Sequence, residues 1–175
     1  MLNKKLYSRI YKDNPGDPLH PIYVGGHYEK QSGLPARRFR LLGLACSALC
    51  FFLLLGAGLR PSAASRVMYS VPFYAAAFLP AVLCLAAFLQ SPGDDAPIRE
   101  DAHYYSFARI QSCSAIGMGL TALAFLGGGA ASIAAGSFSG MTLLYEGLLL
   151  AAFFDFFLLR RLWRGQVYVL RTDPA

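Results

Sequence analysis

Two carboxylic acids, Glu146 and Asp155, interrupt the last long apolar stretch of the chain. A charged side chain at the centre of a bilayer costs about 2.5–3.5 kcal/mol on insertion scales, so acids at such positions are candidates for a functional role. On a helix, the spacing between these two residues corresponds to about 13.5 Å along the axis and to opposite faces. The two carboxyls therefore cannot share one proton or one cation, and each needs a partner of its own.

Each acid has a structural and a chemical interpretation. Asp155 lies about 7.5 Å along the helix from Arg160. Either Arg160, Arg161 or a contact with another helix would satisfy its carboxyl. Glu146 has no cation within a helical turn in the sequence. It makes a structural hydrogen bond, or it handles an ion, a proton or a substrate. Glu146 and Asp155 are therefore our candidates for ion or proton coupling.

Three of the four cysteines, Cys46, Cys84 and Cys113, lie about six residues from the same end of their apolar stretches. Cys50 lies one helical turn deeper than Cys46. A thiolate centre for metal or redox chemistry requires such convergence. However, no Cys-x-x-Cys occurs and no histidine lies at that depth. Cysteine is also a common small residue in apolar interiors, so we expect these side chains to serve packing.

Motifs of soluble enzymes are absent from the sequence. It contains no G-x-S-x-G, no H-E-x-x-H and no phosphate-binding loop. Three histidines follow no metal-binding spacing, namely His20, His27 and His103. We therefore expect neither a metal nor another cofactor, and the sequence favours a non-enzymatic role over a catalytic one.

Composition indicates a membrane protein. The chain of 175 residues is 55% hydrophobic and 15% charged, with a mean hydropathy of +0.42, whereas an average soluble domain is about 25% charged. Asp, Glu, Lys and Arg are absent from three long stretches, 41–59, 67–93 and 110–145. Apolar runs of about 18 residues or more are typical of membrane spans. The sequence predicts an all-α, polytopic membrane protein, a bundle of four transmembrane helices at residues 39–59, 67–90, 107–126 and 141–162.

The distribution of Lys and Arg predicts the orientation of this bundle. Of the 16 basic residues, eight lie before the first span or at its start, four at the end of the fourth span or after it, two in or beside the second loop and two in the first loop. We assign the richer side, and with it both termini, to the cytoplasm. The chain then divides into a cytoplasmic segment (1–36), a transmembrane domain (37–162) and a cytoplasmic tail (163–175). A plasma membrane is the expected location, and the lack of organellar targeting signals favours a bacterial inner membrane. We attribute the excess of positive charge to the orientation of the protein in the membrane. We therefore expect no nucleic-acid partner.

The N-terminal segment has two interpretations. Residues 20–28 and 167–170 have strand character and would pair as a two-stranded ribbon, although such ribbons are marginally stable alone. Alternatively, the segment lies on anionic lipid at the cytoplasmic face through basic residues. These residues are Lys4, Lys5, Arg9 and Lys12.

The second and third loops differ in character. The second loop is acidic, with Asp94, Asp95, Glu100 and Asp101. It pairs with the basic N-terminal segment, docks a partner protein or is a solvated turn. The third loop, residues 127–140, is uncharged and rich in glycine. It is a flexible outer connection or a segment that dips into the outer leaflet.

Small residues recur at helical spacing on the first and third spans, where they allow helices to pack closely. They are Gly43, Ser47 and Cys50, and Cys113, Gly117 and Thr121. The expected partners are the lipid bilayer and either another membrane protein or further copies of this chain.

Two classes of function remain open. The first is a non-catalytic membrane subunit or scaffold, which docks cytoplasmic factors with its N-terminal segment and acidic loop. The alternative is a small oligomeric transporter or channel in which Glu146 binds a proton or cation.

Overall fold

A computed structural model describes residues 7, 10–12, 22–59, 70–136 and 139–171. The helices are α2 (Ala36–Gly58), α3 (Val71–Gln90), α4 (Glu100–His103), the π-helical turn η2 (Tyr104–Ala108), α5 (Arg109–Ala134) and α6 (Gly140–Arg164). The strands are β1 (Tyr11–Lys12), β2 (Ile22–Tyr23), β3 (His27–Ser32), β4 (Ile98–Arg99) and β5 (Val167–Arg171). The segments α4, η2 and α5 form one continuous helix. Four helices are thus long and apolar enough to cross a membrane, as the sequence predicts.

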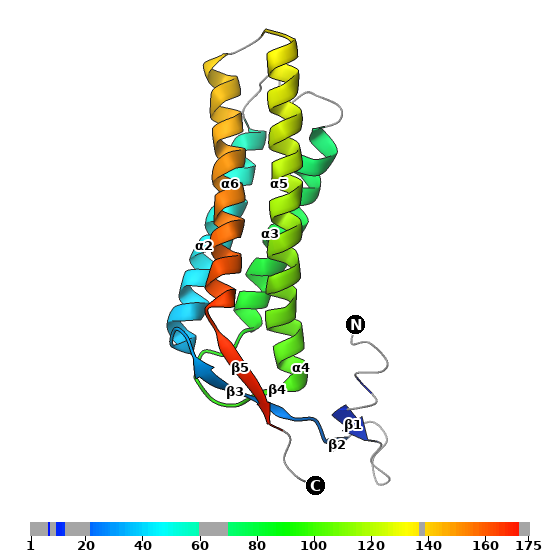
Figure 1. Cartoon of the computed structure of the whole chain (residues 1–175), viewed down its shortest axis with the longest axis vertical. Coiled ribbons are helices and arrows are strands. Elements are labelled where there is room, and N and C mark those ends of the chain that lie inside the picture. The colour runs from blue at the N-terminus through cyan, green and yellow to red at the C-terminus, as the bar shows by residue number, and fades with distance from the viewer. Residues whose placement is uncertain (1–6, 8–9, 13–21, 60–69, 137–138, 172–175) are drawn as a thin grey trace.

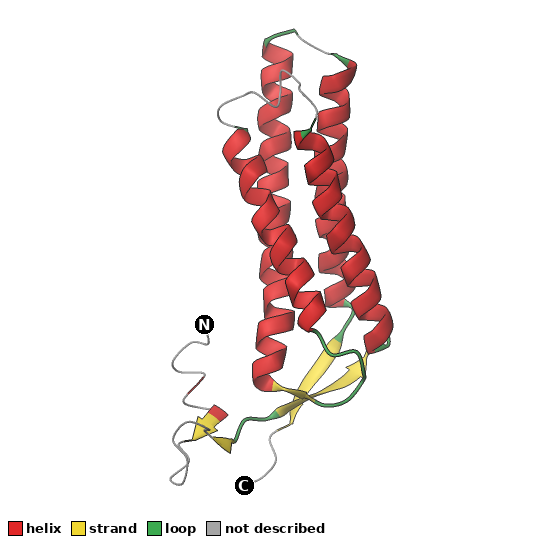
Figure 2. Cartoon of the chain, turned by 180° about the vertical axis from the view of Figure 1, so that it is seen from behind, coloured by secondary structure: helices red, strands yellow, loops and turns green. Residues whose placement is uncertain are grey.

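The four long helices lie side by side as a bundle (Figure 1). Helix α5 packs against α3 and α6, and α2 packs against the same two helices. Strands β3, β4 and β5 lie together at one end of this bundle, which we call the sheet end (Figure 2). Strand β4 leads directly into α4, and only Gly165 and Gln166 separate α6 from β5, so the sheet is joined closely to the helices.

All six small residues predicted to pack helices are buried, namely Gly43, Ser47 and Cys50 on α2 and Cys113, Gly117 and Thr121 on α5. A Cβ atom added to Gly43 would lie 2.1 Å from the Phe88 ring, and one added to Gly117 would lie 2.5 Å from the Phe156 ring. Each glycine therefore lets an aromatic ring pack directly on the backbone of its helix. These stripes serve packing within the chain, which leaves them inaccessible to a partner.

The third loop is shorter than predicted. Helix α5 continues through the glycines to Ala134, so the expectation of a connection over residues 127–140 is wrong for residues 127–134. Gly128 and Ser132 are buried there, and the Ser132 hydroxyl donates to the Gly128 carbonyl at 2.9 Å. Packing against α6 outweighs the low helix propensity of glycine. The helix ends at Ala134, and the chain turns away at Gly136, whose φ of +58° is readily adopted by glycine. Residues 137–138 lie outside the described residues.

The sheet end adds β-structure that an all-α description omits. Strand β3 is central and pairs antiparallel with β4 on one side and β5 on the other. The expected pairing of the tail with the N-terminal segment is confirmed, although the strand spans His27–Ser32 rather than residues 20–28. The second loop supplies β4 as a third strand, and three strands packed on helices are stable where a two-stranded ribbon is not.

Candidate functional site

The carboxyl of Glu146 lies inside the bundle near the end opposite the sheet. Both of its oxygens are buried, and neither has a hydrogen-bond partner among the described residues. The neighbouring Tyr145 is 1% exposed and packs its ring against Tyr74 at 6.2 Å between centroids. A buried carboxyl without a partner costs free energy. Within the described residues, Glu146 therefore does not make the structural hydrogen bond that was one of its two interpretations from the sequence.

Asp155 finds its partners on another helix. Its side chain is buried, and its carboxyl interacts with the Cys46 thiol and the Cys50 backbone of α2. No ion pair joins it to Arg160 or Arg161 in the described residues, because it faces α2 in the bundle interior. Its Oδ2 atom has no hydrogen-bond partner there. Asp155 and Glu146 therefore occupy separate environments, as their opposite helix faces predict.

The four cysteines converge at the level of Asp155. Cys84 on α3 and Cys113 on α5 interact through their thiols, and Cys50 lies near both Cys46 and Cys84. The depth pattern in the sequence predicts this convergence. All four thiols are free. Across the described ranges, no three His, Cys, Asp or Glu side chains are arranged to hold a metal ion.

At the sheet end, Asp95 of the second loop caps helix α2. The helix begins after Pro35, which supplies no side-chain cap. Asp95 Oδ1 accepts instead from the Ala36 amide at 3.0 Å and pairs with the Lys30 ammonium at 2.6 Å. Lys30 first, and then the Ala36 amide, hold the pKa of Asp95 below its usual value. The acidic loop therefore pairs with the N-terminal segment at this point, which is one of the alternatives that the sequence leaves open.

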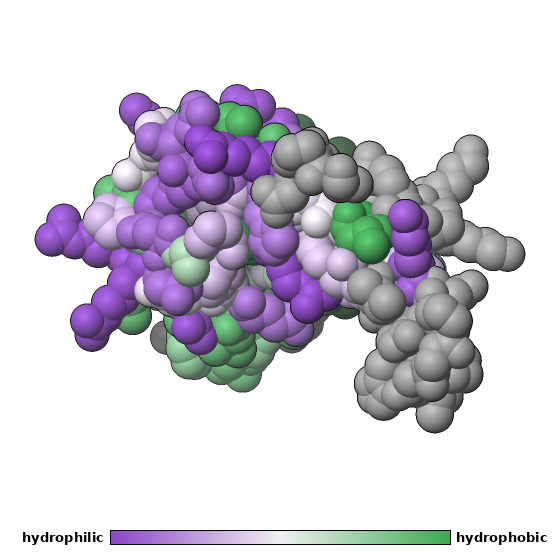
Figure 3. Space-filling model, turned by 90° about the horizontal axis from the view of Figure 1, so that it is seen from below, coloured by the Kyte–Doolittle hydropathy of each residue, from purple (hydrophilic) through white to green (hydrophobic). Residues whose placement is uncertain are grey.

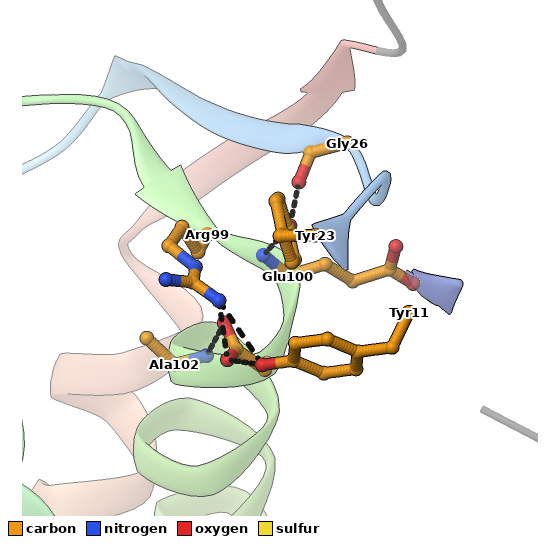
Figure 4. A network of polar contacts seen from close by, with 7 residues as sticks. Tyr11, Tyr23, Gly26, Arg99, Glu100 and Ala102 are labelled. Carbon is orange, nitrogen blue, oxygen red and sulfur yellow. Dashed lines mark hydrogen bonds and ion pairs between the residues drawn. The ribbon is translucent and has the colours of Figure 1, made fainter. Parts of the chain in front are cut away.

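A second polar network ties β1 and β2 to the second loop (Figure 4). The Tyr11 hydroxyl donates to Asp101 at 2.5 Å, and Arg99 lies within 3.3 Å of the same carboxylate. The hydrogen bond to Asp101, followed by burial, raises the pKa of Tyr11. The Arg99 guanidinium also stacks over the Tyr23 ring at 4.2 Å, and the Tyr23 hydroxyl accepts from the Glu100 amide at 2.9 Å. The network thus links two short strands near the N-terminus to a loop that lies more than 70 residues later in the sequence.

The other residues that the sequence suggests for docking differ in their exposure. Asp94 is exposed, Glu100 is buried and Lys12 lies in β1. The other basic residues proposed for lipid contact, Lys4, Lys5 and Arg9, and the histidine His20 lie outside the described residues. The lipid-surface interpretation of the N-terminal segment therefore stays a prediction.

An aromatic cluster, which the sequence does not reveal, joins the sheet to the bundle. The Phe107 ring lies 5.2 Å from Trp163 and 4.9 Å from Tyr168 between centroids. His103 stacks on Tyr28 at 3.9 Å. Burial raises the pKa of Tyr168 to about 12. The sequence shows the strand character of residues 167–170, but this continuous apolar run does not indicate which face of the strand is covered.

Comparison with protein-family models, with curated proteins and with solved structures finds no match for this chain.

Proposed function

We propose that this chain is a non-catalytic membrane subunit that spans a plasma membrane with four helices and docks a cytoplasmic partner protein on the free edge of β5. Large apolar side chains cover the outside of the bundle, among them Phe52, Leu79 and Leu126, each more than 60% exposed. Such an extensive apolar surface is unfavourable in water and suits lipid. The excess of Lys and Arg on the side of the sheet favours a cytoplasmic sheet end.

The open edge of β5 is the observation that carries the docking proposal. Among the described strands, β5 pairs with β3 alone and is an edge of the sheet. Backbone N–H and C=O groups along such an edge are available to another strand. Tyr168 turns toward the bundle, whereas Val167 and Val169 are 45% and 38% exposed. An extended peptide with apolar residues at alternate positions would extend the sheet and cover these valines.

The surroundings of β5 also suit a protein partner. Seen from below, the sheet end is mainly hydrophilic, with small hydrophobic areas between polar ones (Figure 3). A partly apolar strip within a polar surface resembles the core and rim of a protein interface. The strip is also rigid, because the aromatic cluster around Phe107 and the pairing with β3 fix β5 from two sides. A preformed edge lowers the ordering cost of docking.

Charged residues on the edge should abolish docking. We expect the double variant Val167→Lys, Val169→Lys to lose its partner, because lysines on an edge strand oppose strand addition. Native mass spectrometry on protein extracted gently from its own membrane measures the stoichiometric complex. Hydrogen exchange should also show slower exchange of the β5 amides in the wild-type complex than in the isolated chain.

Val24→Lys is the matched control, because Val24 is 44% exposed and lies outside β5. It should keep the partner. Equal loss in both variants would attribute the effect to added charge, and a complex that survives the double substitution would contradict docking at β5.

A small proton- or cation-coupled transporter is the second candidate function, and the unpartnered carboxyl of Glu146 favours it. An intramembrane acid that no neighbour satisfies is available to a transported ion. A homo-oligomer in native mass spectrometry, without a different protein, would agree with this function.

Substitution of Glu146 separates a coupling role from a structural one. Because its oxygens have no partner among the described residues, Glu146→Leu should raise Tm by a few degrees. Glu146→Gln should fold in normal yield. If Glu146 couples transport, both variants lose potential-driven proton uptake into proteoliposomes. Uptake that is unchanged in Glu146→Gln excludes this acid as the coupling group.

A further inference from the structure

A groove of about 540 Å³ lies between α2 and α6 at the sheet end. Leu42 and Cys46 of α2 form one wall, and Leu158 and Leu162 of α6 form the other. The volume falls within the range of about 300–1,000 Å³ that is usual for small-molecule sites. Leu42 and Leu158 are 47% and 52% exposed, so the groove opens sideways from the bundle. In the proposed membrane orientation, it opens into the cytoplasmic leaflet.

The sheet end of the groove is closed by the turn before α2. Gly33 has a φ of +121°, and a Cβ atom there would lie 2.7 Å from the Gly165 carbonyl. Gln166 is buried. Its side-chain amide is assigned the orientation in which the nitrogen donates to the Leu34 carbonyl at 3.2 Å and the oxygen accepts from the Leu34 amide at 3.0 Å. The closed end is therefore a fixed wall with satisfied polar groups.

Positive charge lies beside this closed end. Arg161 lines the groove about one helical turn nearer the sheet than Leu158. It is exposed and has no ion-pair partner within the described part of the chain. Arg38 lies one turn before Leu42 on the same face of α2 and is also exposed. The site thus has an apolar body and a cationic end at the level where lipid headgroups lie.

We propose that this groove binds one anionic phospholipid of the cytoplasmic leaflet, with an acyl chain between α2 and α6 and the phosphate on Arg161. A guanidinium binds phosphate through charge-assisted, often bidentate, hydrogen bonds. The apolar walls suit an acyl chain and hold it apart from the moving lipid of the leaflet. A partner helix is about 10–12 Å wide with its side chains, and the closed sheet end at Gly33 and Leu34 limits how far such a helix could extend along the groove. The inference rests on the proposed membrane orientation but not on partner docking at β5.

Lipid titration of the full chain tests this site. The purified protein is stripped of lipid in detergent and titrated with phosphatidylglycerol or phosphatidylcholine, and bound lipid is counted by native mass spectrometry. We expect one tightly bound phosphatidylglycerol and weaker binding of phosphatidylcholine. Arg161→Gln should weaken phosphatidylglycerol binding about tenfold. Leu42→Trp fills the groove without changing charge, and it should prevent tight binding of either lipid.

Arg37→Gln is the matched control, because it removes the same charge from an exposed position on the opposite face of α2 from Leu42. Its affinity should equal that of the wild type. Equal weakening in Arg37→Gln and Arg161→Gln, equal affinity for the two lipids, or tight binding that survives in Leu42→Trp would each overturn the proposal. Val167→Lys, Val169→Lys should leave lipid binding intact, so failure of this site and failure of partner docking are distinguishable.

Discussion

Replacing Phe107 with alanine should lower the free energy of unfolding by about 3–5 kcal/mol, the usual cost of removing a fully buried aromatic ring. Phe107 is 1% exposed and contacts Phe39 of α2, Trp163 of α6 and Tyr168 of β5. Its loss opens a cavity where two helices and the sheet meet. Trp163 is the one tryptophan of the chain, so its fluorescence reports unfolding of this joint directly.

The substitution Phe154→Ala is the control for this experiment. Phe154 is 54% exposed on the outside of the bundle, and removing its ring leaves no internal cavity. Its Tm should stay close to that of the wild type. If both variants lose the same stability, the effect reflects aromatic content in general, and Phe107 has no special role in joining sheet and bundle.

Replacing Gly43 with leucine should be the second large effect. A Cβ atom at this position would lie 2.1 Å from Phe88, closer than any real contact, and the rest of the leucine side chain would follow it into the ring. Overpacking of a core costs about 1–3 kcal/mol, and occasionally more. Because the obstacle is an aromatic ring on a neighbouring helix, we expect the upper part of this range. Thermal unfolding in detergent measures the loss.

A second substitution tests whether the clash is the cause. In the Gly43→Leu background, Phe88→Ala should recover part of the lost stability, because the leucine then fills the space of the ring. Gly119→Leu is the control, since nothing lies within 4 Å of a Cβ atom at Gly119. A loss in Gly119→Leu as large as that in Gly43→Leu would contradict the assignment to the Phe88 contact.

The sequence identifies both acids of the last apolar helix but not their surroundings. Glu146 and Asp155 stand out because they interrupt an apolar stretch, and their spacing correctly predicts separate environments. The partner of Asp155 is not predictable in this way: its neighbours in sequence are Arg160 and Arg161, but it interacts with Cys46. Which face of α6 meets α2 depends on how the helices rotate in the bundle, and the sequence of one helix does not determine that rotation.

The alternatives left open at the sheet end also depend on long-range contacts. The strand character of residues 167–170 is visible in the sequence, but its partner β3 lies more than a hundred residues earlier. Asp95 reads as a loop residue, and only its contact with Ala36 makes it the cap of α2. The glycines at 127–129 suggest a loop, because glycine has a low helix propensity. Packing against neighbouring helices nevertheless keeps this segment helical, and such packing cannot be seen in the local sequence.

By itself, the sequence determined the number of long helices, their approximate limits and the similar depth of Cys46, Cys84 and Cys113. These features follow from the hydropathy and spacing of residues along one segment, so each segment carries the information for its own helix. Only the tertiary structure revealed the three-stranded sheet, the aromatic cluster around Phe107, the partner of Asp155 and the groove at Arg161. These features require side chains from different segments to meet, and the free energy of such contacts depends on the packing of the whole bundle.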